Sequence, residues 1–141
     1  MPKQRTTDQS ITSLKKGEVF VFGSNLSGRH GKGAALQALE WGAIIGLGEG
    51  PYGNTYAIPT KDNKLKTLPI KDIKACISRF ERFAKNHPEK TFLVTEIGCG
   101  LAGYMPKDIA PLFAGCIDVK NVHFPERFWS ILSLYVKFEL P

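Results

Sequence analysis

The pattern of hydrophobic and polar positions along the chain predicts short strands that alternate with helices. Strands are predicted where short apolar runs end at glycine or proline, at residues 18–23, 55–60, 91–98 and 121–124. Helices are predicted where apolar residues recur at helical spacing, over 33–45, 70–86, about 109–116 and from Pro125 onward. This alternation is typical of an α/β protein whose sheet is covered by helices on both faces.

The segments between these elements are predicted to be irregular. Residues 1–16 are polar and form a lead-in, and 46–54 is a glycine-rich loop without a periodic pattern. Asp108 is the expected N-cap of the third helix, which places Pro111 in the first turn. With 141 residues and no internal repeat, the chain is expected to form a single domain, 1–141.

Composition narrows the class of protein. Hydrophobic residues make up 43% of the chain and charged residues 23%, which is ordinary for a globular protein. No run approaches the roughly 18 apolar residues of a membrane span, and the amino-terminal residues contain no apolar segment typical of a secretory signal. We therefore expect a cytoplasmic protein in which Cys76, Cys99 and Cys116 are reduced thiols. The cysteines lack metal-ligand spacing, so neither a metal nor a cofactor is expected.

The net charge of +6, from 19 Lys and Arg against 13 Asp and Glu, leaves two interpretations open. A basic surface suits a polyanion or a small ligand that carries phosphate groups. The same excess of charge also serves solubility. Charge alone does not choose between these interpretations.

The segment FGSNLSGRHGKGAA (22–35) joins a predicted strand to a predicted helix and contains four glycines. Glycines at such a junction let backbone amides approach an anion, so phosphate or diphosphate is the expected guest. The spacing of known phosphate loops is absent. Gly33 stands where a P-loop has Ser or Thr, and Asn25 stands where the dinucleotide fingerprint requires glycine. The segment therefore belongs to neither class of loop.

Two polar side chains in this segment have both a binding and a structural interpretation. Asn25, at the end of the strand, offers an acceptor and two donors to a ligand with neighbouring hydroxyls, such as a ribose. Alternatively it bonds to its own backbone in a local turn. His30 is placed to contact phosphate or to act as an acid or base, although a histidine in such a turn is expected to face solvent.

Three segments, in the same order along the chain, resemble macro domains, a family of ADP-ribose-binding proteins. They are FVFGSNLSGRHGKGAALQAL (20–39), GNTYAIPTKD (53–62) and VTEIGCGLAGYMP (94–106), and the resemblance covers about residues 18–113. It implies a three-layer α/β/α fold with a central mixed sheet. It also implies binding of ADP-ribose, or a related NAD-derived nucleotide, in a cleft at the carboxyl ends of the strands.

The resemblance also assigns site residues. Asn25 would hold the ribose that carries the leaving group, and the segment 31–34 would line the diphosphate and the terminal ribose. The segment 98–104 would wrap the other side of the diphosphate with its main-chain amides. The complete set of implied ligand-binding residues is Gly23, Ser24, Asn25, Gly31, Lys32, Gly33, Ala34, Pro59, Thr60, Gly98, Cys99, Gly100, Leu101, Ala102, Gly103 and Tyr104.

The stretches IGCGL and IPTKD are most similar to one macro-domain branch, the terminal ADP-ribose protein glycohydrolases. In that branch a lysine attacks the anomeric carbon of the ribose and an aspartate of the second loop acts as a base. Lys61 matches the lysine, whereas Ala102 occupies the position of the aspartate and cannot accept a proton. Asp62 is an alternative base, and a solvated lysine is the alternative for Lys61. No aspartate or glutamate is assigned to the adenine.

Three functions follow as hypotheses. The protein binds ADP-ribose as a non-catalytic reader of a modified macromolecule, or it hydrolyses ADP-ribose from that macromolecule, with Asn25 and Lys61 as the candidate catalytic residues. A more distant alternative is a small basic protein that binds nucleic acid directly, although no nucleic-acid motif is present. Cys99 is expected to be a packing residue, since no histidine partner for a nucleophile is evident.

Overall fold

Strand β2 (Glu18–Asn25) lies at the centre of the fold because both of its faces are apolar. Val19 and Val21 pack on one side of the sheet, and Phe20 and Phe22 pack on the other. All four side chains are at most 4% exposed, so other elements cover the strand on both sides. β2 pairs in parallel with β4 (Thr55–Lys61) and with β5 (Thr91–Val94).

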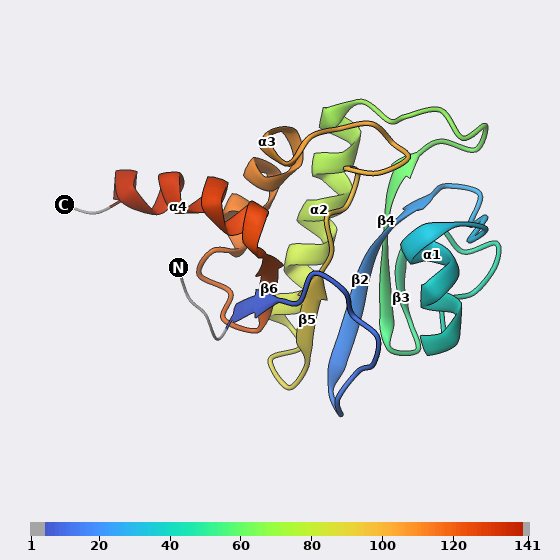
Figure 1. The fold of residues 1–141 in the computed structure, drawn as a ribbon, viewed down its shortest axis with the longest axis horizontal. Coiled ribbons are helices and arrows are strands. Elements are labelled where there is room, and N and C mark those ends of the chain that lie inside the picture. The colour runs from blue at the N-terminus through green and yellow to red at the C-terminus, as the bar shows by residue number, and fades with distance from the viewer. Residues whose placement is uncertain (1–4, 140–141) are drawn as a thin grey trace.

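The computed structural model describes residues 5–139, which contain a six-stranded sheet in the order β1-β6-β5-β2-β4-β3 (Figure 1). The other strands are β1 (Thr6–Thr7), β3 (Gly50–Tyr52) and β6 (Val122–Pro125). β3 runs antiparallel to β4, whereas the remaining pairs are parallel. The sheet is therefore mixed, as predicted.

Helices cover both faces of the sheet and complete three layers. On one face, α1 (Gly33–Ala38) and the 3₁₀ helix Leu39–Trp41 pack against the cluster formed by Phe20, Phe22 and Ala57. The opposite face carries α2 (Ile70–Lys85), α3 (Pro106–Ile109), the 3₁₀ helix Ala110–Cys116 and α4 (Glu126–Glu139). The predicted α/β/α architecture is confirmed. None of the described helices is long and apolar enough to cross a membrane.

Arg5 fastens the amino-terminal strand to the carboxyl-terminal half of the chain. Its guanidinium donates hydrogen bonds of 2.7 to 3.2 Å to four backbone carbonyls between the 3₁₀ helix and β6, those of Cys116, Ile117, Val119 and Val122. The guanidinium carbon also lies 5.0 Å from the centre of the Trp129 ring. The Trp129 indole N–H in turn donates to the Arg5 carbonyl at 2.8 Å. The interactions of one side chain thus hold together segments more than 100 residues apart.

The helix predicted over 33–45 is shorter than expected. Its α-helical part ends at Ala38, a 3₁₀ turn follows, and Gly42 then adopts a left-handed conformation with φ of 112°. Within this segment Ala35 and Ala38 are buried, whereas Leu36 and Ile44 are about half exposed. Gly42 ends the helical segment because a left-handed residue is incompatible with its continuation.

Four smaller expectations were also wrong. The loop predicted over 46–54 contains strand β3, and the strand predicted over 91–98 ends at Val94. The lead-in predicted over 1–16 contains β1, and its residues 1–4 lie outside the described part. The third helix begins at Pro106 rather than after Asp108. The Asp108 carboxylate instead accepts the Met105 N–H at 2.9 Å from inside the first turn.

Candidate functional site

A cavity of about 530 Å³ lies where the parallel strands β5, β2 and β4 end at the same edge of the sheet. The loops that follow these strands form its walls, and its size is within the range of small-ligand sites. Its lining consists of Gly23, Ser24, Asn25, Arg29, Gly31, Lys32, Gly33, Ala34, Ala35, Thr60, Lys61, Leu65, Thr95, Glu96, Ile97, Gly98, Gly100, Leu101 and Ala102.

Most of the predicted site residues, from three distant segments, line this cavity, and four do not. The four outside are Pro59, Cys99, Gly103 and Tyr104. The Tyr104 hydroxyl donates to the Leu68 carbonyl at 2.6 Å, and both Tyr104 and Cys99 pack against the core. Gly103 belongs to a turn, with its N–H bonded to the Gly100 carbonyl at 3.0 Å.

Six lining residues were not predicted: Arg29, Ala35, Leu65, Thr95, Glu96 and Ile97. Arg29 and Ala35 lie inside the glycine-rich segment, and their position next to the predicted residues could have indicated that they line the cavity. Thr95, Glu96 and Ile97 directly precede the second glycine loop, because β5 ends four residues earlier than expected. No sequence signal marks Leu65.

The side chain of Asn25 organises the loop that follows β2. Its amide oxygen accepts hydrogen bonds from the Ser27 hydroxyl at 2.8 Å and from the Arg29 N–H at 2.9 Å, and its amide nitrogen donates to the Arg29 carbonyl at 2.8 Å. The local-turn interpretation of Asn25 is therefore the one that the structure shows. Asn25 still lines the cavity, where one amide hydrogen has capacity for a ligand.

The loop formed by residues 43–49, here called the bracing loop, packs against this loop from outside. Gly28 lies against the backbone of Gly46 and Leu47, and Gly48 lies against the backbone of Asn25 and Leu26. A side chain on either glycine would overlap the backbone of the facing loop. The Ser24 hydroxyl donates to the Gly48 carbonyl across the same contact. Gly28 and Gly48 therefore serve the packing of the two loops and not a ligand.

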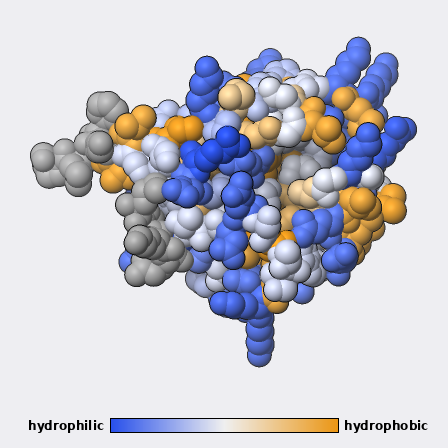
Figure 2. Space-filling view, viewed as in Figure 1, coloured by the Kyte–Doolittle hydropathy of each residue, from blue (hydrophilic) through white to orange (hydrophobic). Residues whose placement is uncertain are grey.

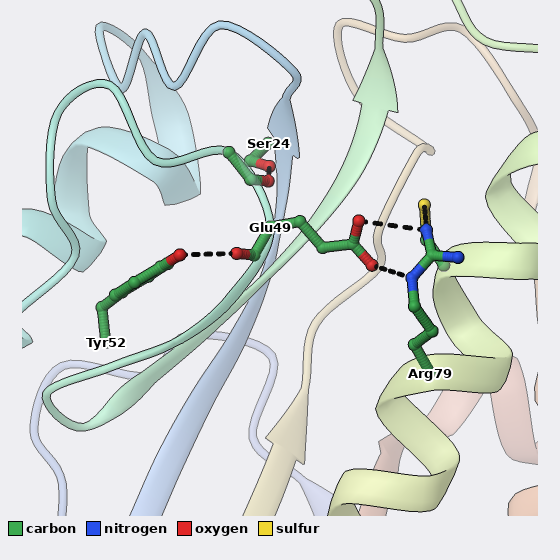
Figure 3. A network of polar contacts seen from close by, with 6 residues as sticks. Ser24, Glu49, Tyr52 and Arg79 are labelled. Carbon is green, nitrogen blue, oxygen red and sulfur yellow. Dashed lines mark hydrogen bonds and ion pairs between the residues drawn. The ribbon is translucent and has the colours of Figure 1, made fainter.

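Figure 3 shows how the bracing loop is itself anchored. The Glu49 carboxylate accepts two hydrogen bonds from the Arg79 guanidinium of α2, at 2.6 and 3.0 Å, and the Glu49 carbonyl accepts the Tyr52 hydroxyl at 2.8 Å. The ion pair is largely exposed, so it contributes modestly to stability. Its position links α2, through the bracing loop, to the residues that line the cavity.

The charges around the cavity are predominantly positive. Arg29, Lys32 and Lys61 line it, and none of them takes part in an ion pair of the described residues. The Glu96 carboxylate also lines it but accepts hydrogen bonds from Nε and Nη2 of Arg127, both at 2.6 Å, which hold its pKa below the ordinary value. The cavity therefore favours an anion.

Lys61 and Asn25 lie beside each other at the ends of β4 and β2. The register pairs the two residues, and the Leu26 N–H donates to the Lys61 carbonyl at 2.9 Å. The alternative base, Asp62, is occupied elsewhere, since its carboxylate accepts backbone N–H groups of Lys64 and Lys66 at 2.8 and 2.9 Å. These bonds lower the pKa of Asp62 and make it a weak base.

Two other candidates for chemistry have structural surroundings. Burial raises the pKa of the Cys99 thiol to about 11, which argues against a nucleophile. His30 was expected to face solvent, but only 3% of it is exposed. Its Nε2 lies 3.0 Å from the Ile44 carbonyl, and its ring meets Phe22 edge-on, because the bracing loop covers it. Among the described residues, no three His, Cys, Asp or Glu side chains gather in a metal-binding group.

A second cavity, of about 970 Å³, adjoins the first. It lies between residues 6–12 and the start of α4, where Glu126 and Arg127 border it. Ala34, Thr95 and Glu96 line both cavities, so the two are neighbours. The second cavity lies on the β1 and β6 side of the first.

Comparison with known proteins adds information about the fold. No protein-family model matches the chain, and no curated protein matches it. Among solved structures, a protein of unknown function from Bacteroides thetaiotaomicron is similar, with a TM-score of 0.60 and 16% sequence identity. The match covers 85% of this chain and 93% of that chain. At this level of identity the similarity shows a common fold and nothing about a ligand.

Proposed function

We propose that this protein binds ADP-ribose, or a closely related NAD-derived nucleotide, in the cavity at the carboxyl ends of β2, β4 and β5. The observation that carries the proposal is that one cavity combines exposed glycine backbone with cations that form no ion pair among the described residues. Arg29, Lys32 and Lys61 supply the positive charge. A diphosphate needs such charge together with close backbone contact.

Two glycines of the cavity support a ligand of this kind, because neither their backbone conformation nor their packing requires glycine. Gly31 and Gly100 line the cavity, neither has a positive φ, and no atom lies within 4 Å of the position that a Cβ would take. Neither backbone conformation nor packing therefore excludes a side chain. Close approach of a ligand to the backbone explains both residues. The resemblance of these loops to macro domains points to the same ligand class.

Binding without catalysis is the form of the proposal that we favour. In the lysine-mediated route of the enzymes that these loops resemble, a carboxylate acts as the base. Of the described carboxylates near the cavity, Glu96 is held by Arg127 and Asp62 is held in its own turn. Ala102 occupies the loop position where the resembling enzymes have an aspartate. A reader of free or attached ADP-ribose needs no such base.

Calorimetric titration with ADP-ribose tests the proposal. Wild type should bind with a dissociation constant in roughly the micromolar range, which is about −8 kcal/mol. Lys32→Ala should weaken binding by about tenfold or more, since a charge-assisted contact to phosphate is lost. Lys74→Ala, which removes an exposed cation of α2 away from the cavity, is the matched control and should bind like wild type. Absence of binding by the wild type would contradict the proposal.

Hydrolysis is the second candidate function, and one observation favours it. Lys61 lines the cavity beside Asn25 and has no ion-pair partner among the described residues. Incubation with ADP-ribosylated protein or nucleic acid, followed by chromatography of released ADP-ribose, separates the two functions. Release by the wild type that is lost in Lys61→Ala would establish the enzyme. Binding without release would establish the reader.

A further inference from the structure

Two exposed leucines stand at the β4 end of the cavity. Leu65 belongs to the loop that follows β4, and Leu101 belongs to the loop that follows β5; both line the cavity. Leu65 is 41% exposed and Leu101 is 70% exposed. The Thr67 hydroxyl donates to the Ala102 carbonyl at 2.8 Å, which ties the two loops together. We call Leu65 and Leu101 the leucine lip.

Leu65 has a backbone conformation that its side chain disfavours. Its φ is 63°, and among the described residues it alone has a positive φ without being glycine. Glycine or asparagine is the usual residue in this region because a larger side chain crowds the backbone. Folding gains little in return, since much of the leucine side chain remains exposed. Strain of this kind is typical of functional sites.

The turn around Leu65 is held in place by its own hydrogen bonds. The Asp62 N–H donates to the Lys66 carbonyl at 2.7 Å, and the Leu65 N–H donates to the Asp62 carbonyl at 3.0 Å. The Asp62 carboxylate also accepts N–H groups from Lys64 and Lys66. Leu65 is therefore a fixed apolar surface at the cavity. Figure 2 shows hydrophobic side chains beside projecting hydrophilic ones on this side of the molecule.

We infer that the leucine lip contacts an uncharged planar ring on the terminal ribose, so that the preferred ligand is a dinucleotide, two nucleosides joined through a diphosphate. This inference rests on the proposed function and specifies its ligand. Leucine side chains offer no hydrogen bond, so hydroxyl groups of a bare terminal sugar would lose water there without replacement. A planar ring gains from the same contact.

The two adjoining cavities leave room for a ligand with a ring at each end. In this arrangement the diphosphate lies next to Arg29, Lys32, Gly31 and Gly100, which line the first cavity. The leucine lip closes its β4 end. The second cavity, which shares Ala34, Thr95 and Glu96 with the first, leaves room for the other nucleoside at the β1 and β6 end.

Titration with two probes that differ only at the terminal ribose tests the inference. Diadenosine diphosphate carries a second adenine where ADP-ribose carries a free sugar. Wild type should bind diadenosine diphosphate about tenfold more tightly, which corresponds to about 1.4 kcal/mol. In the double variant Leu65→Asn with Leu101→Ser, the ratio of the two affinities should fall towards one.

Equal affinity of the wild type for the two probes would overturn the inference, and so would a tenfold ratio that persists in the double variant. Failure of both probes to bind would instead overturn the proposed function, so the two failures are distinguishable. Thermal unfolding of Leu65→Asn provides a second readout. Asparagine tolerates a positive φ, so we expect an unchanged or raised melting temperature together with the lost preference. A lowered melting temperature would show that Leu65 serves folding.

Discussion

Alanine at Gly28 should destabilise the protein and alanine at Gly31 should not, although the two glycines are three residues apart in one loop. A Cβ on Gly28 would overlap the backbone of Gly46 and Leu47, and the φ of Gly28 is 69°. A Cβ on Gly31 would meet no atom within 4 Å, and its φ lies outside the left-handed region. Gly28 is therefore required for packing, whereas Gly31 is not.

The expected magnitudes follow from these surroundings. Gly28→Ala should lower the free energy of unfolding by about 3 kcal/mol, since a side chain at positive φ costs about 1–2 kcal/mol and the overlap adds about 1–3 kcal/mol. Gly31→Ala should change it by less than about 0.5 kcal/mol, as at other surface positions. For ADP-ribose binding, substitution of Gly31 should have the larger effect. Gly31→Val places two methyl groups where the backbone meets the ligand and should weaken ADP-ribose binding by more than about tenfold.

Urea denaturation monitored by tryptophan fluorescence measures the stabilities, and calorimetry measures binding of ADP-ribose to the folded variants. Gly31→Ala and Gly31→Val form a size series that separates steric exclusion from a loss of folding. The reasoning fails if Gly31→Ala unfolds as readily as Gly28→Ala. It also fails if Gly31→Val remains folded and binds ADP-ribose like the wild type.

Two further predictions concern the scaffold and the second glycine loop. Arg5→Ala should destabilise the protein by about 3 kcal/mol, because buried carbonyls lose charge-assisted donors; Arg5→Lys should recover only part of this in urea denaturation, and full recovery would show that charge alone matters. Cys99 should resist iodoacetamide in the native protein at pH 8, because its pKa of about 11 leaves little thiolate. Rapid alkylation, measured by mass spectrometry, would contradict the buried environment.

Local patterns were sufficient to predict the main strands and the longest helix. The apolar run at 18–23 and the periodicity at 70–86 correspond to β2 and α2. The misassigned parts depend on contacts between distant residues. β3 contains only Gly50–Tyr52 and exists because it pairs with β4. β1 is two residues long, and Arg5 fastens it to carbonyls more than 100 residues away. Neither relation leaves a periodic signal in the sequence.

The site could be predicted where it follows from strand ends. Glycines after β2 and β5 meet in one cavity because parallel strands end at the same edge of the sheet. His30 was misjudged because its burial depends on a loop that returns from residues 43–49 to cover it. Leu65 could not be predicted, since a leucine is not expected at positive φ.

Asn25 illustrates how a residue can matter to a ligand chiefly through the loop that it shapes. Its amide oxygen already accepts two hydrogen bonds, and its amide nitrogen already donates one, all within the segment 25–29. The capacity left for a ligand is a single N–H. The same bonds fix the backbone that carries Arg29, Gly31 and Lys32 into the cavity. Under the proposed function, phosphate recognition rests on the backbone and the cations, and Asn25 positions them.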